Sequence, residues 1–236
     1  MRNWLTFNGK SSKDFGVYIS GLNTFDAPER DVETVAVAGR NGELTLDNGR
    51  YKNIDVTYPA FIFDDMSANI AGLRNFLLSQ RGFKRLEDTY HPDEYRLARY
   101  KGDFSAKVVD WLEAGKFDLV FDCYPQRFLK SGEHVISLSS ADTIFNEYMQ
   151  TSKPLIRAYG TGSFTIEDVT ITINTANGYT DIDCDLQEAY KDTLDNSCNS
   201  YITLNDGVFP ELVSGENDIS MSGLTQLDII PRWWIL

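Results

Sequence analysis

The sequence is poor in the residue types that build nucleophilic and metal sites, with two histidines and three cysteines among 236 residues. An odd number of cysteines without a CxxC pair argues against a disulfide framework and against a zinc ribbon. No apolar run reaches about eighteen residues, so we expect no membrane span. The first residues also lack the apolar segment of a secretory signal. These absences favour a soluble protein made in a reducing compartment.

Basic residues are scarce as well. The chain has 22 Lys and Arg against 35 Asp and Glu, a net charge of −13, and a pI near 4.5. This balance argues against specific nucleic-acid binding, because phosphate contacts need clustered positive charge. Residues 1–130 carry 18 basic and 19 acidic side chains, whereas residues 131–236 carry 4 and 16. The shift predicts two domains, 1–130 and 131–236, with Lys130–His134 as a polar linker.

What the chain does contain is apolar and aromatic, 42% and 13% of its residues, which is enough for packed cores. Most apolar residues alternate with polar ones, as in strands. One segment has helical spacing instead, with Ile70, Leu73 and Leu77 before Gly82, and either Asp64 or Asp65 as its N-terminal cap. The pattern predicts a mainly β protein with one helix. The first domain is a β-sandwich or α+β domain, and the second is an antiparallel β-sandwich.

A β-hairpin is predicted in the first domain. Thr34–Ala38 alternates large and small residues, which indicates a half-buried strand, and Leu44–Leu46 forms the returning strand. Between them lies Arg40-Asn41-Gly42-Glu43, whose Asn-Gly pair is a strong hairpin signal. Asp47-Asn48-Gly49 predicts a second turn. We take Arg40, Asn41, Gly42 and Glu43 as candidates for contact with a neighbouring subunit, because hairpin edges can pair across an interface.

Three carboxylates alternate along the strand predicted at Tyr179–Leu186. Asp181, Asp183 and Asp185 share one face, and Ile182, Cys184 and Leu186 share the other, which we expect to face the core. Calcium favours such oxygen ligands, but an extended strand cannot curl round an ion. We therefore expect a solvent-exposed acidic face and no metal site. Paired carboxylates for glycoside hydrolysis remain an alternative on so acidic a domain.

No catalytic group emerges from the other candidates. His91 and His134 lie in polar segments, where we expect solvated histidines without a nucleophile to activate. Gly160–Ser163 lacks the lysine and following helix of a phosphate loop, which leaves a turn. Cys123 and Cys184 are expected to be buried thiols and Cys198 an exposed one. The predicted inventory holds no catalytic residue, cofactor or metal, and Pro231–Trp234 is a candidate to return onto the first domain.

Several short motifs resemble, in order, those of the distal tail (Dit) proteins of long-tailed, non-contractile bacteriophages. The resemblance begins at Phe7-Asn8-Gly9 and Asp14–Val17, and it ends at Pro231-Arg232-Trp233. Between these ends it runs through the following segments: Gly39–Leu44, Arg50–Asn53, the Leu73–Leu78 helix with Gly82, Asp88–Tyr95, Phe121–Phe128, Phe209–Leu212 and Gly215–Asn217. Residues 131–200 match least well.

The resemblance implies a structural virion protein of the tail tip, made in the host cytoplasm. Its first domain would form a homohexameric ring between the tail tube protein and the tail-associated lysin or tip hub protein. Its second would be a galectin-like or carbohydrate-module-like sandwich outside the ring, in reach of a receptor-binding protein or host-wall saccharide. No catalytic activity is implied. The rival interpretation is a saccharide-binding module or glycoside hydrolase acting through the acidic second domain.

Overall fold

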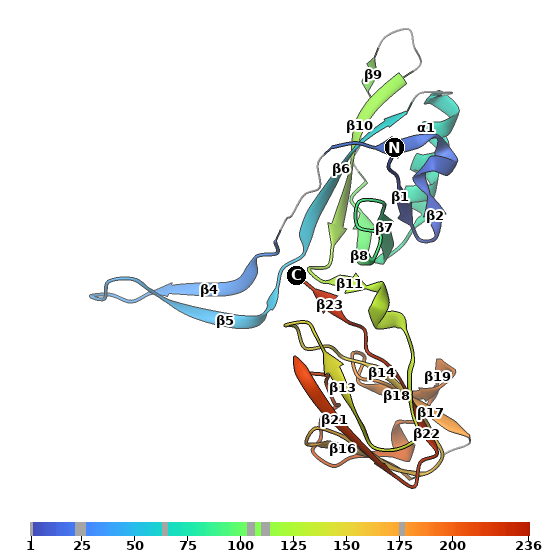
Figure 1. The fold of residues 1–236 in the computed structure, drawn as a ribbon. Coiled ribbons are helices and arrows are strands. Elements are labelled where there is room, and N and C mark those ends of the chain that lie inside the picture. The colour runs from blue at the N-terminus through green and yellow to red at the C-terminus, as the bar shows by residue number, and fades with distance from the viewer. Residues whose placement is uncertain (1, 22–26, 63–65, 103–106, 110–113, 175–177) are drawn as a thin grey trace. The chain divides into compact units, whose positions relative to one another are not determined.

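The computed structural model describes residues 2–21, 27–62, 66–102, 107–109, 114–174 and 178–236. The chain divides into two compact units, one of residues Met1–Arg127 with Leu236 and one of residues Phe128–Ile235 (Figure 1). Each unit has its own cluster of buried apolar side chains. No helix among the described residues has the length and apolar character needed to cross a membrane.

The first unit is built on one antiparallel sheet, whose main path runs β2-β1-β7-β8-β10-β6-β3 with β9 paired to β10. A 3₁₀ helix, Ser12–Phe15, links β2 to β3. A two-stranded hairpin, β4 (Arg30–Ala36) with β5 (Glu43–Tyr51), precedes β6. The strands of the main sheet are β1 (Leu5–Phe7), β2 (Lys10–Ser11), β3 (Val17–Ile19), β6 (Ile54–Ile62), β7 (Lys84–Asp88), β8 (Glu94–Tyr100), β9 (Lys107–Val109) and β10 (Ala114–Cys123).

The core of this unit follows from alternation in β6 and β10. The two strands pair in unbroken register from Gly115 opposite Ile62 to Cys123 opposite Ile54. Every second side chain of β10 is buried, at Phe117, Leu119, Phe121 and Cys123. Removing a leucine or phenylalanine side chain from water is worth about 1.5–3 kcal/mol, so this row contributes much of the unit's stability.

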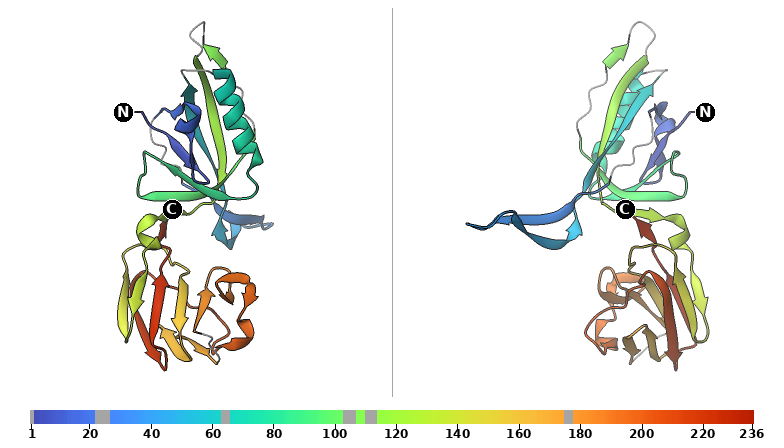
Figure 2. Two further views of the ribbon diagram at one scale, coloured as in Figure 1. Left: turned by 90° about the vertical axis from the view of Figure 1, so that its right-hand side faces the viewer. Right: turned by 60° about the vertical axis from the view of Figure 1, so that its left-hand side comes forward.

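The one α-helix of the described residues, α1 (Met66–Ser79), covers one face of the sheet (Figure 2). Leu73 and Leu77, one helical turn apart, are each 1% exposed. Phe76 meets Phe7 edge to face, with ring centroids 6.4 Å apart. The predicted helix is confirmed, and Gly82 after it has φ of +69°. The proposed caps Asp64 and Asp65 lie outside the described residues.

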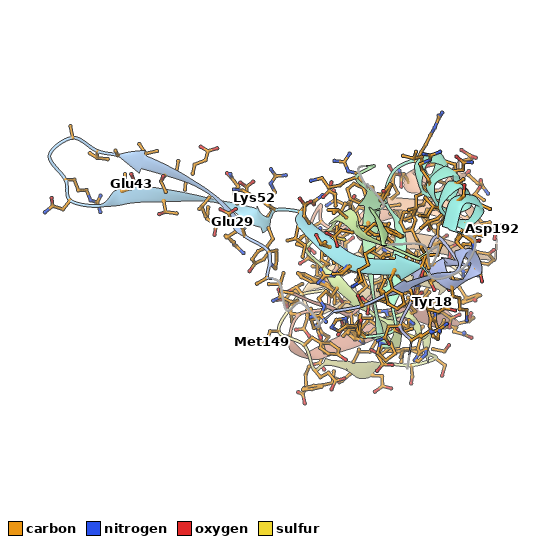
Figure 3. The ribbon with its side chains drawn as sticks, turned by 90° about the horizontal axis from the view of Figure 1, so that it is seen from above. Tyr18, Glu29, Glu43, Lys52, Met149 and Asp192 are labelled. Carbon is orange, nitrogen blue, oxygen red and sulfur yellow. The ribbon has the colours of Figure 1, made fainter. Side chains whose placement is uncertain are left out.

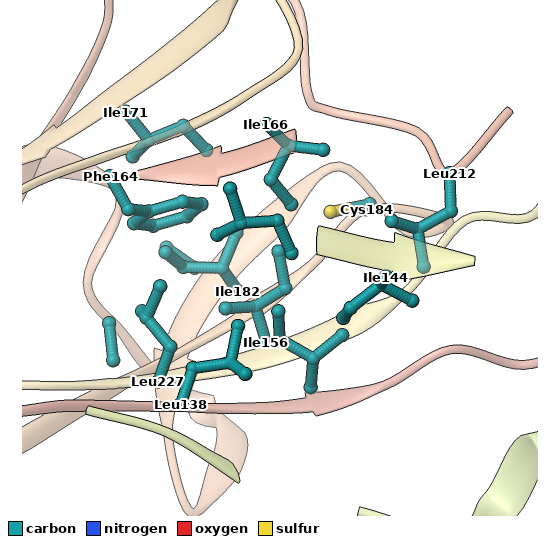
Figure 4. Packing of buried hydrophobic residues seen from close by; sticks show 14 of the residues in the cluster. Leu138, Ile144, Ile156, Phe164, Ile166, Ile171, Ile182, Cys184, Leu212 and Leu227 are labelled. Atoms are coloured by element: carbon teal, nitrogen blue, oxygen red, sulfur yellow. The ribbon is translucent and has the colours of Figure 1, made fainter. Parts of the chain in front are cut away.

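The second unit is a sandwich of two antiparallel sheets. One sheet has the order β12-β22-β14-β17-β18-β19 and the other β13-β21-β15-β16-β20. Their inner faces form one core, in which Ile156, Phe164 and Ile182 are at most 1% exposed (Figure 4). The prediction of a mainly β fold with a single α-helix is confirmed. The strands are β12 (Ile136–Leu138), β13 (Asp142–Asn146), β14 (Leu155–Tyr159), β15 (Gly162–Ile166), β16 (Val169–Ile173), β17 (Tyr179–Asp183), β18 (Glu188–Lys191), β19 (Thr193–Ser197), β20 (Ile202–Leu204), β21 (Gly215–Ser222) and β22 (Gln226–Ile230).

The expected linker is a structured part of the second unit. Lys130–Glu133 forms a 3₁₀ helix after β11 (Arg127–Leu129), which pairs with β23 (Trp234–Ile235). Gly132 lies so close to the chain that a Cβ atom there would meet the Trp233 nitrogen at 2.2 Å. Lys130–Glu133 is therefore a packed segment of the second unit and not the polar linker predicted for Lys130–His134.

The C-terminal segment has contacts inside the second unit, and the return of Pro231–Trp234 onto the first domain stays a prediction. Trp233 is 8% exposed in the apolar cluster of the second unit, with its ring 6.3 Å from that of Tyr148. Trp234 donates from its indole nitrogen to the Thr151 carbonyl at 3.0 Å. Both tryptophans thus have partners within the second unit.

The three cysteines are all free and buried. Burial is as expected for Cys123 and Cys184, and it raises the pKa of the Cys123 thiol to about 12. The expected exposure of Cys198 is wrong, since it is 6% exposed. Its N–H donates to the Ala189 carbonyl at 2.7 Å, which draws this polar segment onto β18.

Candidate assembly interface

The β4–β5 hairpin extends away from the main sheet of the first unit (Figure 1). Among the described residues, β4 and β5 pair only with each other, so the outer edge of each strand is open. Ion pairs hold the end nearest the sheet: Arg30 with Asp47 at 2.9 Å, Arg50 with Asp31 at 2.7 Å and Lys52 with Glu29 at 3.5 Å. Figure 3 shows Glu29 and Lys52 at this base, with Glu43 far out along the hairpin.

The second turn predicted at Asp47-Asn48-Gly49 lies beside the Arg30–Asp47 pair. The Asp47 Oδ1 accepts the Gly49 N–H at 2.8 Å, and Gly49 has φ of +73°. The hydrogen bond from the Gly49 N–H and the hydrogen bond from Arg30 lower the pKa of Asp47. The register shifts between Arg30 and Val32, so Asp47-Asn48-Gly49 is an irregularity inside β5 and not the predicted second turn.

One face of the hairpin is apolar and open to solvent. Val35 pairs with Leu44, and Leu46 pairs with Glu33, so these side chains share a face. Val35 is 45% exposed, Leu44 is 40% exposed and Leu46 is 55% exposed. Val37, two residues beyond Val35, is 40% exposed. We call Val35, Val37, Leu44 and Leu46 the apolar stripe.

The opposite face is small and polar. Thr34 pairs with Thr45, and Ala36 pairs with Glu43. All four of these residues are exposed, so the described residues cover neither face of the outer hairpin. The expectation of a half-buried strand at Thr34–Ala38 is wrong in this respect. The alternation is present, but no other described part of the chain packs on the face that it creates.

The four interface candidates lie together at or beside the tip. β4 ends at Ala36 and β5 begins at Glu43, so the loop is longer than a two-residue Asn-Gly turn. The Arg40 N–H donates to the Val37 carbonyl at 3.1 Å, and Gly42 takes φ of +81°. Arg40, Asn41, Gly42 and Glu43 are exposed. Sequence analysis identified this tip but missed the apolar stripe, because alternation alone does not distinguish a covered face from an open one.

The row of aspartates in the second unit has a different environment from the one predicted. Asp181 and Asp183 are each 3% exposed. Asp181 accepts two hydrogen bonds from Arg157, at 2.6 and 3.0 Å. Asp183 accepts two from Arg232, both at 2.7 Å. The predicted acidic solvent face is therefore wrong for these two residues, because each buried carboxylate has an arginine as its counter-charge.

The strand itself is shorter than predicted. β17 ends at Asp183, whose Oδ1 accepts the N–H groups of Asp185 and Leu186 at 3.1 Å. This turn leaves Leu186 53% exposed, against the expectation that it faces the core. Within the described part of the chain, no group of three or more His, Cys, Asp or Glu residues has the geometry to hold a metal ion.

A second acidic region lies on the other sheet of this unit, at a shallow cavity of about 400 Å³. Asp142, Glu167 and Asp218 line it, together with Ala141, Thr143, Ile219 and Ser220. The Asp218 Oδ1 accepts the Thr143 hydroxyl at 2.8 Å, and Glu167 accepts the Asp218 N–H at 2.7 Å. The Asp142 Oδ1 also accepts the Thr143 N–H at 2.8 Å, so all three carboxylates have partners within the chain.

Comparison with known proteins identifies the fold. No protein-family model and no curated protein sequence matches the chain. Among solved structures, the Dit protein of phage SPP1, described as a paradigm of the hub adsorption apparatus in phages infecting Gram-positive bacteria, is 13% identical. It has a TM-score of 0.76 over 100% of both chains. A chain of the phage P2 baseplate in its activated conformation matches with 9% identity over 97% of both chains. The TM-score is 0.52 for the calcium form and 0.51 for the strontium form. The chain therefore has, over its full length, the fold of a phage tail hub protein.

Proposed function

We propose that this protein is a structural hub of a phage tail tip, forming a hexameric ring that joins the tail tube to the tip and host-adsorption components. The observation that carries the proposal is the full-length likeness to the SPP1 Dit fold. Its partners are then further copies of itself, the tail tube protein, and a tail-associated lysin or tip hub protein. The protein resides in the virion tail tip after assembly in the host cytoplasm.

The β4–β5 hairpin supplies the contact between copies in this proposal. An exposed apolar stripe on a soluble protein is typical of an interaction site. A hairpin of one copy that docks on a different surface of the next forms a head-to-tail contact, and such contacts form a ring when the rotation between copies closes. Arg40–Glu43 at the tip would reach furthest into the neighbour, while the stripe would lose its exposure to water.

The second unit lies outside the ring in this proposal. Its residues contribute 16 acidic side chains and 4 basic ones from Ser131 onward. Like charges at a desolvated contact cost several kcal/mol, which disfavours close packing of this unit on its own copies. A peripheral position leaves it free to dock a receptor-binding protein or to touch host-wall saccharide.

The interface is tested with two matched variants. Leu44→Lys with Leu46→Lys places two charges in the apolar stripe, whereas Thr34→Lys with Thr45→Lys adds the same charge to the opposite face. We expect hexamers for the unsubstituted protein and the threonine variant, and monomers for the leucine variant. Mass is measured by light scattering and ring shape by negative-stain microscopy, with the other tail proteins present. Rings of unchanged abundance in the leucine variant would remove the hairpin from the interface.

The two-domain division, 1–130 and 131–236, is tested by fragments. Leu129 belongs to the core of the second unit, so a fragment ending at Arg127 avoids leaving apolar residues without their partners. We expect fragments 1–127 and 128–236 each to give the circular dichroism and cooperative thermal unfolding of a folded β protein. Ring formation should remain with the first fragment. Two unfolded fragments would contradict the division.

The proposal includes no catalytic activity and no cofactor. The alternative, a saccharide-binding module or glycoside hydrolase, is favoured by the acidic groove at Asp142, Glu167 and Asp218. Its test is glycan-array binding and hydrolysis of host-wall polysaccharide by the purified protein, with Glu167→Gln and Asp218→Asn as variants. Binding or turnover that these variants abolish would establish the alternative in place of a purely structural role.

A further inference from the structure

A small cleft in the first unit contains a cluster of charged side chains that the assembly proposal does not use. Its cavity is about 40 Å³ and lies where β6, β7 and β8 meet the segment after β7. Apolar walls come from Val56, Pro59 and Leu86. The polar groups that line it include Tyr58, Asp88, His91, Glu94, Arg96 and Arg127.

Asp88 fixes one side of this cleft. Its Oδ2 accepts the Tyr58 hydroxyl at 2.8 Å, and its Oδ1 accepts the N–H groups of Tyr90 and His91, both at 2.9 Å. The His91 Nδ1 lies 3.2 Å from the same Oδ1. A carboxylate only accepts hydrogen bonds, so Nδ1 carries the proton and Nε2 is the ring atom left for another partner. His91 is therefore held in place, and the expectation of a solvated loop histidine is wrong.

Arg96 forms the other side, and among the residues that the structure describes it has no ion pair. Glu94, the adjacent carboxylate in the cleft, forms an ion pair with Arg127. Asp88 already accepts from Tyr58 and from the backbone. Burial lowers the pKa of Arg96, which reflects the cost of removing its guanidinium group from water.

Two buried polar atoms of the cleft have no hydrogen-bond partner within the part of the chain that the structure describes. They are the Arg96 Nη1 and the His91 Nε2. Buried arginines are normally paired, because an uncompensated charge away from water is costly. Arg96 donates only, so the partner that it lacks must be an acceptor. His91 Nε2 donates when the ring is charged and accepts when it is neutral. The charged ring therefore suits an oxygen of the group that binds Arg96, and the neutral ring suits a hydroxyl of that group.

We propose that this cleft binds a small oxyanion, a carboxylate or phosphate group, which accepts a hydrogen bond from Arg96 Nη1 and contacts His91 Nε2. The cavity is about three times the roughly 10–15 Å³ that one water molecule needs, and it is too small for a nucleotide or a sugar ring. The group has two possible sources: a free anion in solution, or an acidic side chain presented by another protein. The cleft contains no residue of the apolar stripe, so anion binding can be tested independently of ring formation.

The test uses the full chain and two probes. Inorganic phosphate represents the free anion, and the capped peptide acetyl-Gly-Glu-Gly-amide represents a protein carboxylate, with acetyl-Gly-Gln-Gly-amide as its uncharged control. Binding is followed by the shift in Tm against sodium chloride of equal ionic strength, and by the NMR signals of the Arg96 Nε–H and the His91 ring. We expect a saturable rise in Tm and saturable shifts of both residues with at least one probe.

Two variants identify the binding group. Arg96→Gln removes the proposed donor, whereas Arg81→Gln removes the same charge from an exposed position outside the cleft. Loss of a hydrogen bond to a charged group should weaken binding roughly tenfold or more in Arg96→Gln and leave binding by Arg81→Gln unchanged.

If Arg96→Gln does not fold, the NMR titration of the unsubstituted protein decides whether the cleft binds an anion. Phosphate binding alone indicates a free anion, and binding of the glutamate peptide indicates a partner's side chain. No saturable shift with either probe, or equal shifts with the glutamine peptide, would overturn the proposal.

Discussion

The β4–β5 hairpin and the β6–β10 pair have the same sequence pattern and opposite environments. Both alternate apolar and polar residues, and both are antiparallel pairs. Leu119 in β10 is fully buried, whereas Leu46 in β5 is 55% exposed. The difference is that β10 lies inside a sheet beneath α1, while the hairpin pairs only with itself among the described residues. Alternation of apolar and polar residues thus predicts that a strand has an apolar face, but it does not predict what covers that face.

Ion pairs show the same contrast. The side chains of Arg30 and Asp47, on the hairpin, are 43% and 47% exposed. Those of Arg232 and Asp183, in the second unit, are 29% and 4% exposed. Exposed pairs contribute little because water and salt screen them, whereas a buried carboxylate depends on its partner. A substitution in the buried Arg232–Asp183 pair should therefore lower the free energy of unfolding much more than one in the exposed Arg30–Asp47 pair.

The largest effect is expected for Arg232→Met, which leaves Asp183 buried without its counter-charge. We expect the free energy of unfolding to fall by about 3–5 kcal/mol, as for other buried pairs that lose one partner. Arg30→Met is the matched control, and it should not change stability measurably. Urea unfolding followed by tryptophan fluorescence measures both. Equal losses in the two variants would show that burial does not distinguish these pairs.

Leu119→Ala should follow, because it opens a cavity in the core of the first unit. Large-to-small substitutions of this kind cost about 2–5 kcal/mol, with the higher values where neighbours cannot relax. Leu119 is fully buried within the continuous β6–β10 pairing, which restrains such relaxation. The measurement is again urea unfolding, and a loss below about 1 kcal/mol would indicate a core that can collapse around the site.

The buried pair also predicts a dependence on pH. Burial by itself raises the pKa of Asp183, but hydrogen bonds from Arg232 and the Leu186 N–H, with the charge of Arg232, outweigh it and hold the pKa below its usual value. A carboxylate with a lowered pKa stabilises the folded state above its unfolded pKa of about 3.9, and this stabilisation is lost as the pH falls through the folded value. Unfolding from pH 7 down to pH 3 should show the loss. Asp183→Asn should remove this part of the pH dependence, and an unchanged profile in that variant would contradict the assignment.

The smallest effect on folding is expected for Leu46→Ala on the hairpin. Exposed substitutions usually change stability by less than about 0.5 kcal/mol, and no other part of the described chain covers this side chain. Ring formation should weaken nevertheless, if the apolar stripe is the interface. Unfolding and light scattering on the same sample separate the two readouts. A loss of stability as large as that of Leu119→Ala would mean that the stripe is covered within the monomer.

Local features of the fold could be read from the chain alone. Asn8 and Gly9 take φ of +45° and +77° in the turn between β1 and β2, because few residues other than asparagine and glycine tolerate that region. The helical spacing of Leu73 and Leu77 and the alternation of β10 gave the right elements. Each of these depends on backbone sterics or on a period within a single element, which neighbouring residues determine.

The candidate site was only half predictable. The turn residues Arg40–Glu43 mark the tip in the sequence, but nothing in the chain shows that Val35 and Leu46 stay uncovered. The cleft at Arg96 brings together residues from β6, β7 and β8, and no spacing in the sequence relates Tyr58, Asp88 and Arg96. Such sites depend on which strands become neighbours, which is a property of the whole sheet.

The amino-acid sequence by itself determined the strands, the single helix, the main turns and the uneven charge, because these follow from local sterics, hydrophobic period and composition. Only the tertiary structure decided which side chains of similar local pattern are buried and which are exposed. Asp183 became a buried partner of Arg232, Cys198 was drawn into a core, and Leu46 remained in solvent. The physical reason is that burial is settled by contacts between residues far apart in the chain, which a local pattern does not encode.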